Sequence, residues 1–411
     1  MRKNFLDTVG TAPKKAFAST LLVANAFVWG FYSFRFLNLV TAASNLSNAL
    51  EFTVRGLNFF GIVVAAIFGV YLVYHIKKRV VFLKSWMLTG IVLSLVPTVL
   101  DVSGFVTSAV FFTLVGLYFG FGMPVAFAYF AASTQTNNRS RLGGIIFFAS
   151  FFCVFLLGAL GITDITLNAF LLAAWQSIGF IITTFVKPEE QEINPNDQVP
   201  YSKILHNRPF LLYLIPWIMF IIINFLALPL VEQVFPELFQ YIELIGTVLA
   251  CFLALFFGFF ADRVGRKRLA VLGFAMLGFG YASLGLFSGN IWGWWFFAVA
   301  DGIAWGVFSI VFVMSVWGDL AQEKSSEKYY AIGFLPFLFS FFMQLLAPYV
   351  SLNVPNLAVF SFASVFLFIA VLPLAYAPET LNLKDREFRS YVEKAMQAKL
   401  QHEPDVATAK Q

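Results

Sequence analysis

One acidic side chain lies deep inside an apolar stretch of this sequence. Asp301 sits in the run Trp-Trp-Phe-Phe-Ala-Val-Ala-Asp-Gly-Ile-Ala-Trp, ten residues after Ile291. An ionisable group in such surroundings is costly and points to a functional role. Desolvation favours the neutral form of a carboxyl group, so Asp301 is the residue we expect to take up and release a proton. The alternative is a structural carboxyl group that bonds to a neighbour or to the backbone beside Gly302.

A second group of charged residues follows another apolar run. Residues 258–268 read Gly-Phe-Phe-Ala-Asp-Arg-Val-Gly-Arg-Lys-Arg. Asp262 can face the positive N-terminus of a neighbouring helix, and Gly265 permits a tight turn. Arg263 or Arg266 can reach Asp319 at the end of a later apolar run, although these arginines can also simply contact lipid headgroups. The residues of this expected cluster are Gly258, Asp262, Arg263, Gly265, Arg266 and Asp319.

Metal, cofactor and covalent chemistry are not expected. Cys153 and Cys251 stand alone in apolar runs, and the three histidines fall in or beside polar segments, so there is no zinc spacing or disulfide framework. The sequence has no phosphate-binding loop of the G-x4-G-K-[ST] type. It also lacks paired deep acids and a nucleophile–histidine set. We therefore expect no metal, no cofactor and no enzymatic activity.

The composition identifies the elements that must position these residues. Of 411 residues, 60% are hydrophobic and 12% are charged, and the mean hydropathy is +0.80. A soluble domain carries about 25% charged residues. The composition excludes a soluble enzyme, a disordered chain and a nucleic-acid-binding protein, and it predicts a multi-pass protein of the lipid bilayer. The first apolar run continues to about residue 40, too far for a cleaved signal peptide.

We predict twelve membrane spans. They are expected to be helices because the bilayer offers the backbone no hydrogen-bond partners. The spans lie near 16–41, 50–75, 85–102, 104–133, 142–162, 165–186, 209–231, 237–261, 268–288, 291–317, 330–351 and 356–377.

The positions of the basic residues support this count. If both termini are cytoplasmic, 25 of the 27 Lys and Arg residues fall in the inner segments. The other two, Arg35 and Arg55, come near the outer ends of the first two spans. This asymmetry is what the positive-inside rule predicts, so we expect both termini in the cytosol.

The sequence contains an internal repeat. A polar segment at 187–208 separates two sets of six spans, and a shift of roughly 190 residues aligns Gly69 with Gly258 and Pro188-Glu189 with Pro378-Glu379. In a duplicated transporter the binding site lies between the halves. The expected units are an N-terminal six-helix bundle at 1–186, a cytoplasmic linker at 187–208, a C-terminal six-helix bundle at 209–378 and a cytoplasmic tail at 379–411. The repeat also suggests that Asp262 faces the helix that starts near Arg141.

The loop at 258–268 closely resembles the signature loop G-x-x-x-D-R-x-G-R-K of the major facilitator superfamily. The twelve spans, the central linker and the Pro-Glu-Thr at 378–380 extend this resemblance over the whole chain. The last motif and the Arg/Lys-x4-Gly spacing of two inner loops are similar to the sugar-porter branch. The loop between the second and third spans departs from the family pattern, with Val73 and Ile76 in place of Asp and Gly.

The resemblance implies an all-α membrane protein in which two pseudo-symmetric six-helix bundles enclose a central cavity. It also implies that the cluster around Asp262 latches the outward-facing state, and that spans 1, 4, 7 and 10 line the cavity. Aromatic and amide side chains recur at helical spacing on three of these spans, although such stripes also arise by chance in a chain with 53 Phe. A flat apolar face with a hydrogen-bonding rim suits a sugar or another organic solute. The candidate solute-binding residues are Asn25, Trp29, Tyr32, Trp217, Asn224, Trp305 and Gln344.

These observations together predict a secondary transporter. We expect it to move a small organic solute by alternating access, either facilitatively or coupled to protons through Asp301. The alternative is a transport-inactive membrane sensor or binding protein of the same fold, because fold does not fix function. The expected partners are a small-molecule solute, protons if transport is coupled, and the lipid bilayer, with no nucleic acid. We expect a monomer in the plasma membrane.

Overall fold

The computed structural model describes residues 13–44, 46–193, 198–234, 236–287, 290–322, 325–346 and 356–381. In the first half the helices are α1 (Pro13–Ala43), α2 (Asn48–Ile76), α3 (Arg79–Leu95), α4 (Phe105–Ser133), α5 (Arg139–Ala159) and α6 (Ile165–Val186). The later helices are α7 (Tyr201–Leu205), α8 (Arg208–Val234), α9 (Pro236–Val264), α10 (Arg266–Leu286), α11 (Ile291–Phe308), α12 (Val316–Ala321), α13 (Ser326–Leu346) and α14 (Asn356–Tyr376).

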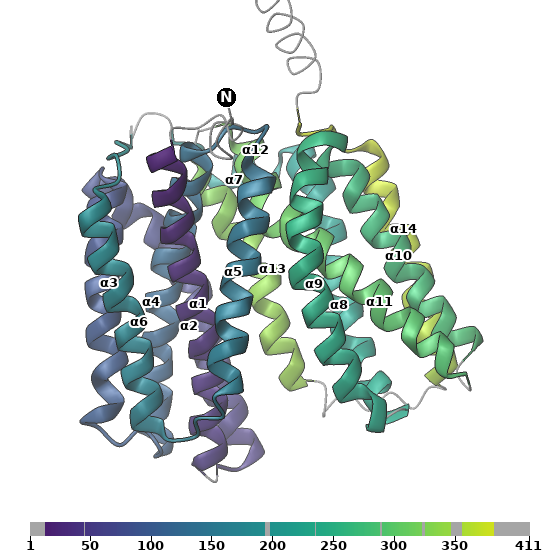
Figure 1. The fold of residues 1–411 in the computed structure, drawn as a ribbon, viewed down its shortest axis with the longest axis horizontal. Coiled ribbons are helices and arrows are strands. Elements are labelled where there is room, and N and C mark those ends of the chain that lie inside the picture. The colour runs from purple at the N-terminus through teal and green to yellow at the C-terminus, as the bar shows by residue number, and fades with distance from the viewer. Residues whose placement is uncertain are drawn as a thin grey trace, which may run out of the picture.

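The long helices form two groups that stand side by side (Figure 1). Helices α1 to α6 make the N-terminal bundle, and α8 to α11 with α14 make most of the C-terminal bundle. Helix α13 lies between the two groups (Figure 1) and packs against α2 and α4 as well as α8. The expected all-α membrane fold of two bundles is confirmed.

Eleven helical stretches of the described residues are long and apolar enough to cross a bilayer. They coincide with eleven of the twelve expected spans. The remaining expected span, 330–351, overlaps α13, and its residues 347–351 lie outside the described part of the chain.

Two spans differ most clearly from expectation, one in its boundaries and the other in a break of its regular helix. The third span runs from Arg79 to Thr98 rather than over 85–102, ending in a 3-10 turn that contains Pro97. Proline lacks the N–H that an α-helix requires, so the regular helix stops before it. The tenth span is interrupted by a π-helical segment, Ser309–Ser315, between α11 and α12.

Matching pairs of glycines bring helices close together in each bundle. A side chain at Gly116 of α4 would collide with the carbonyl oxygen of Asn58 on α2, and Gly120 lies one turn further on. In the C-terminal bundle, Gly302 and Gly306 bring α11 against α9 in the same way. The repeated Gly-x3-Gly spacing lets backbones approach within the membrane. The internal repeat is therefore visible in helix packing.

In each bundle a carboxylate also caps the N-terminus of one helix of the same bundle. Glu190, which follows α6, accepts hydrogen bonds from two backbone N–H groups at the start of α3, at 2.9 and 3.3 Å. Glu379, which follows α14, accepts two at the start of α10, at 2.9 and 3.2 Å. A negative charge at a helix N-terminus is stabilising because it meets the unpaired N–H groups there.

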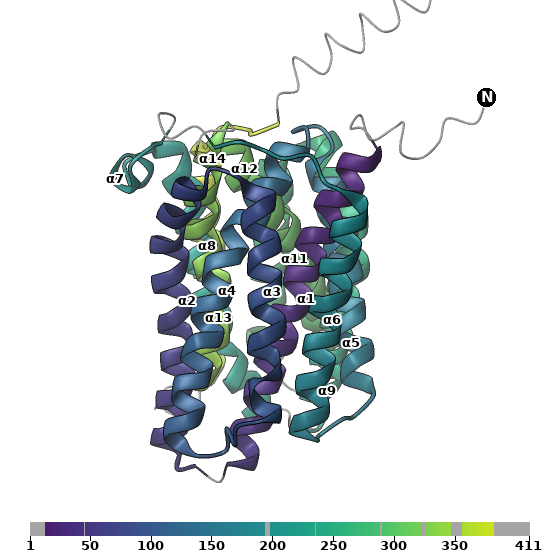
Figure 2. The same ribbon diagram turned by 90° about the vertical axis from the view of Figure 1, so that its left-hand side faces the viewer.

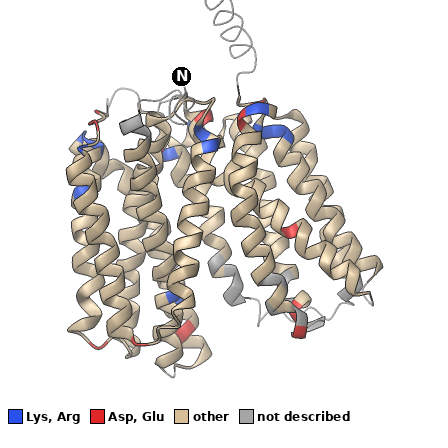
Figure 3. Ribbon diagram, viewed as in Figure 1, with Lys and Arg blue, Asp and Glu red and all other residues tan. Residues whose placement is uncertain are grey.

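We call the end of the molecule that carries α7 and α12 the linker end. The described chain also begins and finishes at this end (Figure 2). Most of the Lys and Arg positions gather there (Figure 3). The polar side chains that join the two bundles lie at this end, which makes it the first place to look for a functional site.

Candidate functional site

The carboxylate of Asp262 joins the two bundles at the linker end. Asp262 is 1% exposed at the end of α9. Its two oxygens accept hydrogen bonds from the backbone N–H groups of Ser140, at 3.2 Å, and Arg141, at 2.9 Å, in the first turn of α5. The charge thus meets the positive end of a helix from the other bundle.

Asp319 of α12 lies between two arginines. One oxygen contacts Nη1 of Arg139 in α5, and the other lies 2.7 Å from Nε of Arg266 in α10. Arg266 also lies 3.4 Å from Asp262 and donates a 2.5 Å hydrogen bond to the carbonyl group of Thr136. We call Asp262, Arg266, Asp319 and Arg139 the aspartate cluster. All four side chains are buried, and two positive charges face two negative ones, so no charge in the cluster is buried without an opposite charge beside it.

Two glycines leave room for this cluster. Gly258 brings α9 so close to α5 that an added Cβ would lie 2.7 Å from the carbonyl oxygen of Ser140. Gly265 has a φ of +106°, which favours glycine, and its missing side chain leaves space for Glu379. Arg263, the other arginine of the signature loop, is exposed, and Arg266 is the one that reaches Asp319.

A second polar contact joins the bundles at the same end, between α13 and the N-terminal bundle. Arg79 at the start of α3 lies 2.7 Å from the carboxylate of Glu327 in the first turn of α13. Sequence reasoning missed this pair, because both residues stand in segments that read as ordinary loop ends. The one signal in the sequence was the position of Glu327, an acid shortly before an apolar run.

The neighbouring Lys328 lies among three aromatic rings. Its Nζ lies 5.4 Å from the ring centroids of Tyr71 and Tyr74 in α2 and 5.3 Å from that of Tyr201 in α7. It also donates a 3.0 Å hydrogen bond to the carbonyl group of Val199. A cation over aromatic faces is stabilised by the ring quadrupoles. We call Lys328, Tyr71, Tyr74 and Tyr201 the tyrosine cage.

Asp301 lies inside the C-terminal bundle, where α11 packs against α9. One carboxylate oxygen would be 3.3 Å from a Cβ placed on Gly246 of α9. The other oxygen is buried and has no hydrogen-bond partner among the described residues. One turn further along α11, Trp305 packs against Phe220 at 4.9 Å and Phe337 at 6.2 Å between ring centroids. Asp301 is thus one turn from the aromatic contacts that lead to α13.

The candidate residues of α1 face helices of their own bundle. Asn25 donates a 2.5 Å hydrogen bond to Gln176 of α6. The indole N–H of Trp29 bonds to Ser94 of α3 at 3.0 Å, and the hydroxyl of Tyr32 bonds to an asparagine of α6 at 2.5 Å. These contacts turn the three polar groups away from α8 and α11.

The candidates of the C-terminal bundle are also held by neighbours. The indole N–H of Trp217 bonds to the carbonyl group of Gly333 in α13 at 3.2 Å. Asn224 accepts a 3.1 Å hydrogen bond from Tyr281 of α10. The side chain of Gln344 lies outside the described residues. The structure therefore brings Trp217 and Trp305 to α13 and leaves Asn224 against α10.

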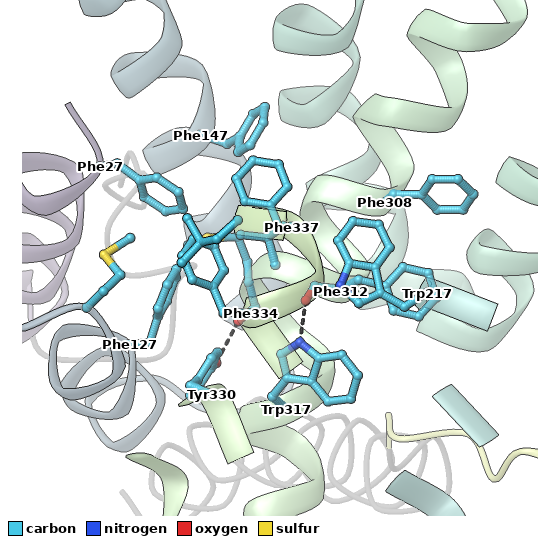
Figure 4. Packing of buried hydrophobic residues seen from close by; sticks show 14 of the residues in the cluster. Phe27, Phe127, Phe147, Trp217, Phe308, Phe312, Trp317, Tyr330, Phe334 and Phe337 are labelled. Carbon is cyan, nitrogen blue, oxygen red and sulfur yellow. Dashed lines mark hydrogen bonds between the residues drawn. The ribbon is translucent and has the colours of Figure 1, made fainter. Parts of the chain in front are cut away.

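Aromatic rings pack together at the boundary between the bundles (Figure 4). Phe27 of α1 contacts Phe334 of α13 at 6.0 Å, and Phe127 of α4 stacks on Tyr330 at 4.9 Å between ring centroids. We call these four residues the aromatic seam. Sequence reasoning did not single them out, because a phenylalanine at a bundle boundary looks like any other in so Phe-rich a chain.

A groove of about 320 Å³ lies where α2 meets α8 and α13. Its walls come from both bundles, and its lining is wholly apolar. The lining residues are Phe59, Val63, Leu214, Ile218, Ile221, Ile222, Ile332, Leu335, Pro336 and Phe339.

Comparisons with known proteins agree with this architecture. The family profile of the Major Facilitator Superfamily matches residues 16–328. Among solved structures, the chain is similar to the major facilitator superfamily proton:xylose symporter XylE bound to 6-bromo-6-deoxy-D-glucose, with a TM-score of 0.61 and 17% identity over 89% of this chain and 96% of that one. A double-tryptophan mutant of XylE gives a TM-score of 0.62 and 16% identity over 90% and 95% of the two chains. No curated protein matches the sequence.

Proposed function

Because the chain belongs to the Major Facilitator Superfamily and is a membrane transporter of that family, we propose that it moves a small organic solute by alternating access. The aspartate cluster carries this proposal. It joins two bundles through ion pairs and helix-end hydrogen bonds, which can separate and re-form as the bundles rock. Rocking of repeated bundles around a site between them is the general mechanism of such transporters.

The linker end faces the cytosol in this proposal. Basic residues gather at that end, as the positive-inside rule requires of cytoplasmic segments. Both termini are then cytoplasmic. The aspartate cluster and the tyrosine cage lie on the cytoplasmic side, so this conformation is closed to the cytosol. We propose a monomer in the plasma membrane as the working unit.

The solute is a sugar or a related metabolite with one flat apolar face. Two indoles, Trp217 and Trp305, meet α13 near the boundary between the bundles, where an aromatic surface can hold such a face. The similar solved structures are of a proton:xylose symporter, which favours this class of solute.

Asp301 couples transport to protons. A carboxylate oxygen without a partner among the described residues is costly in its charged form when it is buried, so protonation of Asp301 relieves that cost. The group lies one turn from Trp305, which connects its charge state to the aromatic surface. A proton gradient would thereby bias solute movement.

The test is pH-driven uptake of a panel of sugars into proteoliposomes, with purified wild type and Asp301→Asn. We expect uptake of at least one sugar by the wild type, and loss of the pH-driven component with retention of counterflow in the variant. Uptake that responds to pH equally in both proteins would refute the coupling role. Asp262→Asn should slow turnover without abolishing membrane insertion, and unchanged turnover would remove the latch role.

The second candidate is a transport-inactive sensor of the same fold. The close ring packing across the aromatic seam favours it, since those contacts must separate for a solute to pass. A sensor would be stabilised against heat by its ligand and yet give no counterflow. Counterflow of any stabilising sugar would exclude it.

A further inference from the structure

The apolar groove between α2, α8 and α13 opens on the lipid side of the molecule. Ile218 and Ile222, two of its lining residues, are 37% and 38% exposed on a membrane span. We propose that this groove binds one acyl chain of an anionic phospholipid, with the headgroup held by basic residues at the linker end. This lipid site does not depend on which solute the protein carries.

The depth of the groove fits an acyl chain of the leaflet at the linker end. Along α8 its lining runs from Leu214 to Ile222, which are six and fourteen residues beyond Arg208. At 1.5 Å per residue these positions are roughly 9 to 21 Å from the start of the helix. The hydrocarbon core of a bilayer is about 30 Å thick, so the groove begins within the leaflet at the linker end and ends a little past the middle of the membrane.

The linker end of the groove is bounded by α7. The hydroxyl of Tyr201 in α7 donates a 2.8 Å hydrogen bond to the carbonyl group of Ile67 in α2. The Tyr201 ring also belongs to the tyrosine cage around Lys328 of α13. Lys328 stands four and eight residues before the lining residues Ile332 and Pro336, on the same face of α13. Helix α7 therefore contacts both α2 and α13, which form two of the walls of the groove.

The charges of α7 and of the start of α8 select an anionic headgroup. Lys203 and Arg208 are both exposed at this end, and no acidic residue occurs between Tyr201 and Val231. Basic residues next to a membrane surface attract anionic lipids. The two cations can hold a phosphate and a second negative charge while the acyl chain occupies the apolar walls below.

The groove also makes the lipid a bridge between the bundles. Phe59 and Val63 come from α2 of the N-terminal bundle, whereas the other walls come from α8 and α13. A chain bound there contacts both bundles at once. Bound lipid should therefore stabilise the conformation in which α2 and α13 are in contact.

The experiment uses the full chain in phosphatidylcholine nanodiscs that contain a trace of phosphatidylglycerol with a photoactivatable diazirine in one acyl chain. After irradiation, mass spectrometry maps the labelled peptides. We expect labelling concentrated on the α2, α8 and α13 peptides that line the groove. Unlabelled phosphatidylglycerol should compete for this labelling, and unlabelled phosphatidylcholine should not.

Two variants separate the chain site from the headgroup site. Ile218→Trp fills the groove and should abolish groove labelling, whereas Ile178→Trp on exposed α6 should leave it unchanged. Lys203→Gln with Arg208→Gln should weaken competition by phosphatidylglycerol roughly thirtyfold. Arg268→Gln, an exposed cation of the C-terminal bundle, is its matched control.

Circular dichroism and size-exclusion chromatography confirm that each variant is folded before it is labelled. Labelling spread evenly over lipid-facing helices would overturn the proposal. Equal competition by the two phospholipids would overturn it too, as would a folded Ile218→Trp protein with unchanged labelling. A dimer whose contact covers the groove would assign the surface to a second copy of the chain and refute the lipid site.

Discussion

The two polar contacts between the bundles at the linker end occupy corresponding places in the internal repeat, and yet they use different chemistry. Between α9 and α5, the carboxylate of Asp262 meets the N-terminus of α5 directly. Between α2 and α13, the repeat places Val73 where Asp262 would be, and the start of α13 meets tyrosine rings instead. The acid on that side, Glu327, belongs to α13 itself and pairs with Arg79.

This difference teaches that closure of one end does not require two copies of one motif. The aspartate cluster is an ionic network with several shared partners, so removing one charge leaves others unpaired. The tyrosine cage spreads the stabilisation of one cation over three rings, so removing one ring leaves the rest in place. We expect closure to depend steeply on the first contact and gradually on the second.

Asp319→Asn is the strongest way to break the first contact. It leaves Arg139 and Arg266 buried without their shared charge, and loss of one partner from a buried pair costs about 3–5 kcal/mol. We expect the closed conformation to be destabilised by that amount. The measurement uses a protein without its native cysteines in which Ser315, buried at the contact with α5, is replaced by cysteine (Ser315→Cys). The rate at which a thiol reagent modifies this cysteine reports how often the contact opens. An unchanged rate would contradict the role of the cluster.

Glu327→Gln breaks the ion pair with Arg79, beside the tyrosine cage, and should have a smaller effect than Asp319→Asn. Arg79 keeps a 3.2 Å hydrogen bond to Gln191, so we expect a cost near the lower limit for a buried pair, about 3 kcal/mol. The same cysteine reaction reports it. Combined with Asp319→Asn, the two effects should add within about 0.5 kcal/mol, because the two contacts share no partners. Strong non-additivity would show that the two contacts are energetically coupled and act as one cluster, which would contradict the distinction drawn between them.

Gly144→Ala tests the close approach of α5 to α9 beneath the aspartate cluster. An added Cβ would lie 2.7 Å from the carbonyl oxygen of Ala254, which is backbone and cannot move aside. We expect overpacking to cost about 1–3 kcal/mol in thermal stability. Gly158→Ala, on the same helix, is the control, because its nearest neighbour is the flexible end of Arg35. Equal losses in both variants would show that the α5–α9 approach is not special.

Tyr201→Leu should have the smallest effect of the series. It removes one of the three rings around the buried Lys328 and leaves the other two, and a cation–π contact contributes from about 0.5–1 kcal/mol when exposed to about 2 kcal/mol when desolvated. Tyr201→Phe keeps the ring and removes only the hydrogen bond to Ile67. A thermal midpoint that falls more for Tyr201→Leu than for Tyr201→Phe supports the cage, and the opposite order would assign the stabilisation to the hydroxyl.

Most of the fold could be predicted because the membrane imposes it on the sequence. A long apolar run in a membrane must become a helix, and the basic residues mark the loops that are expected on one side of the membrane. Boundaries were less predictable where a charge at a helix end has a partner far away in the sequence. Arg79 begins a helix that was expected to start only after Lys84, because its guanidinium pairs with the buried Glu327 of α13.

The candidate site was less predictable, because spacing along a helix identifies a shared face and not the neighbour that covers it. Asn25 and Trp29 do share a face of α1, and their polar atoms bond to α6 and α3. Nothing in the sequence of α1 alone distinguishes that face from one turned toward α8. By contrast, Asp262 and Gly265 could be placed because a charge and a positive φ have few compatible surroundings.

The π-helical segment Ser309–Ser315 has a consequence for how the two acids of the tenth span are oriented. Asp301 and Asp319 are eighteen residues apart, which in an uninterrupted α-helix is about five complete turns and would put both carboxylates on one side. The wider π turn takes up an extra residue, so everything after it is rotated about 100° less than in an uninterrupted α-helix. One acid consequently faces inward within its own bundle and the other faces the partner bundle. A single-residue deletion in this segment would realign them, so the length of the helix here matters as much as its composition.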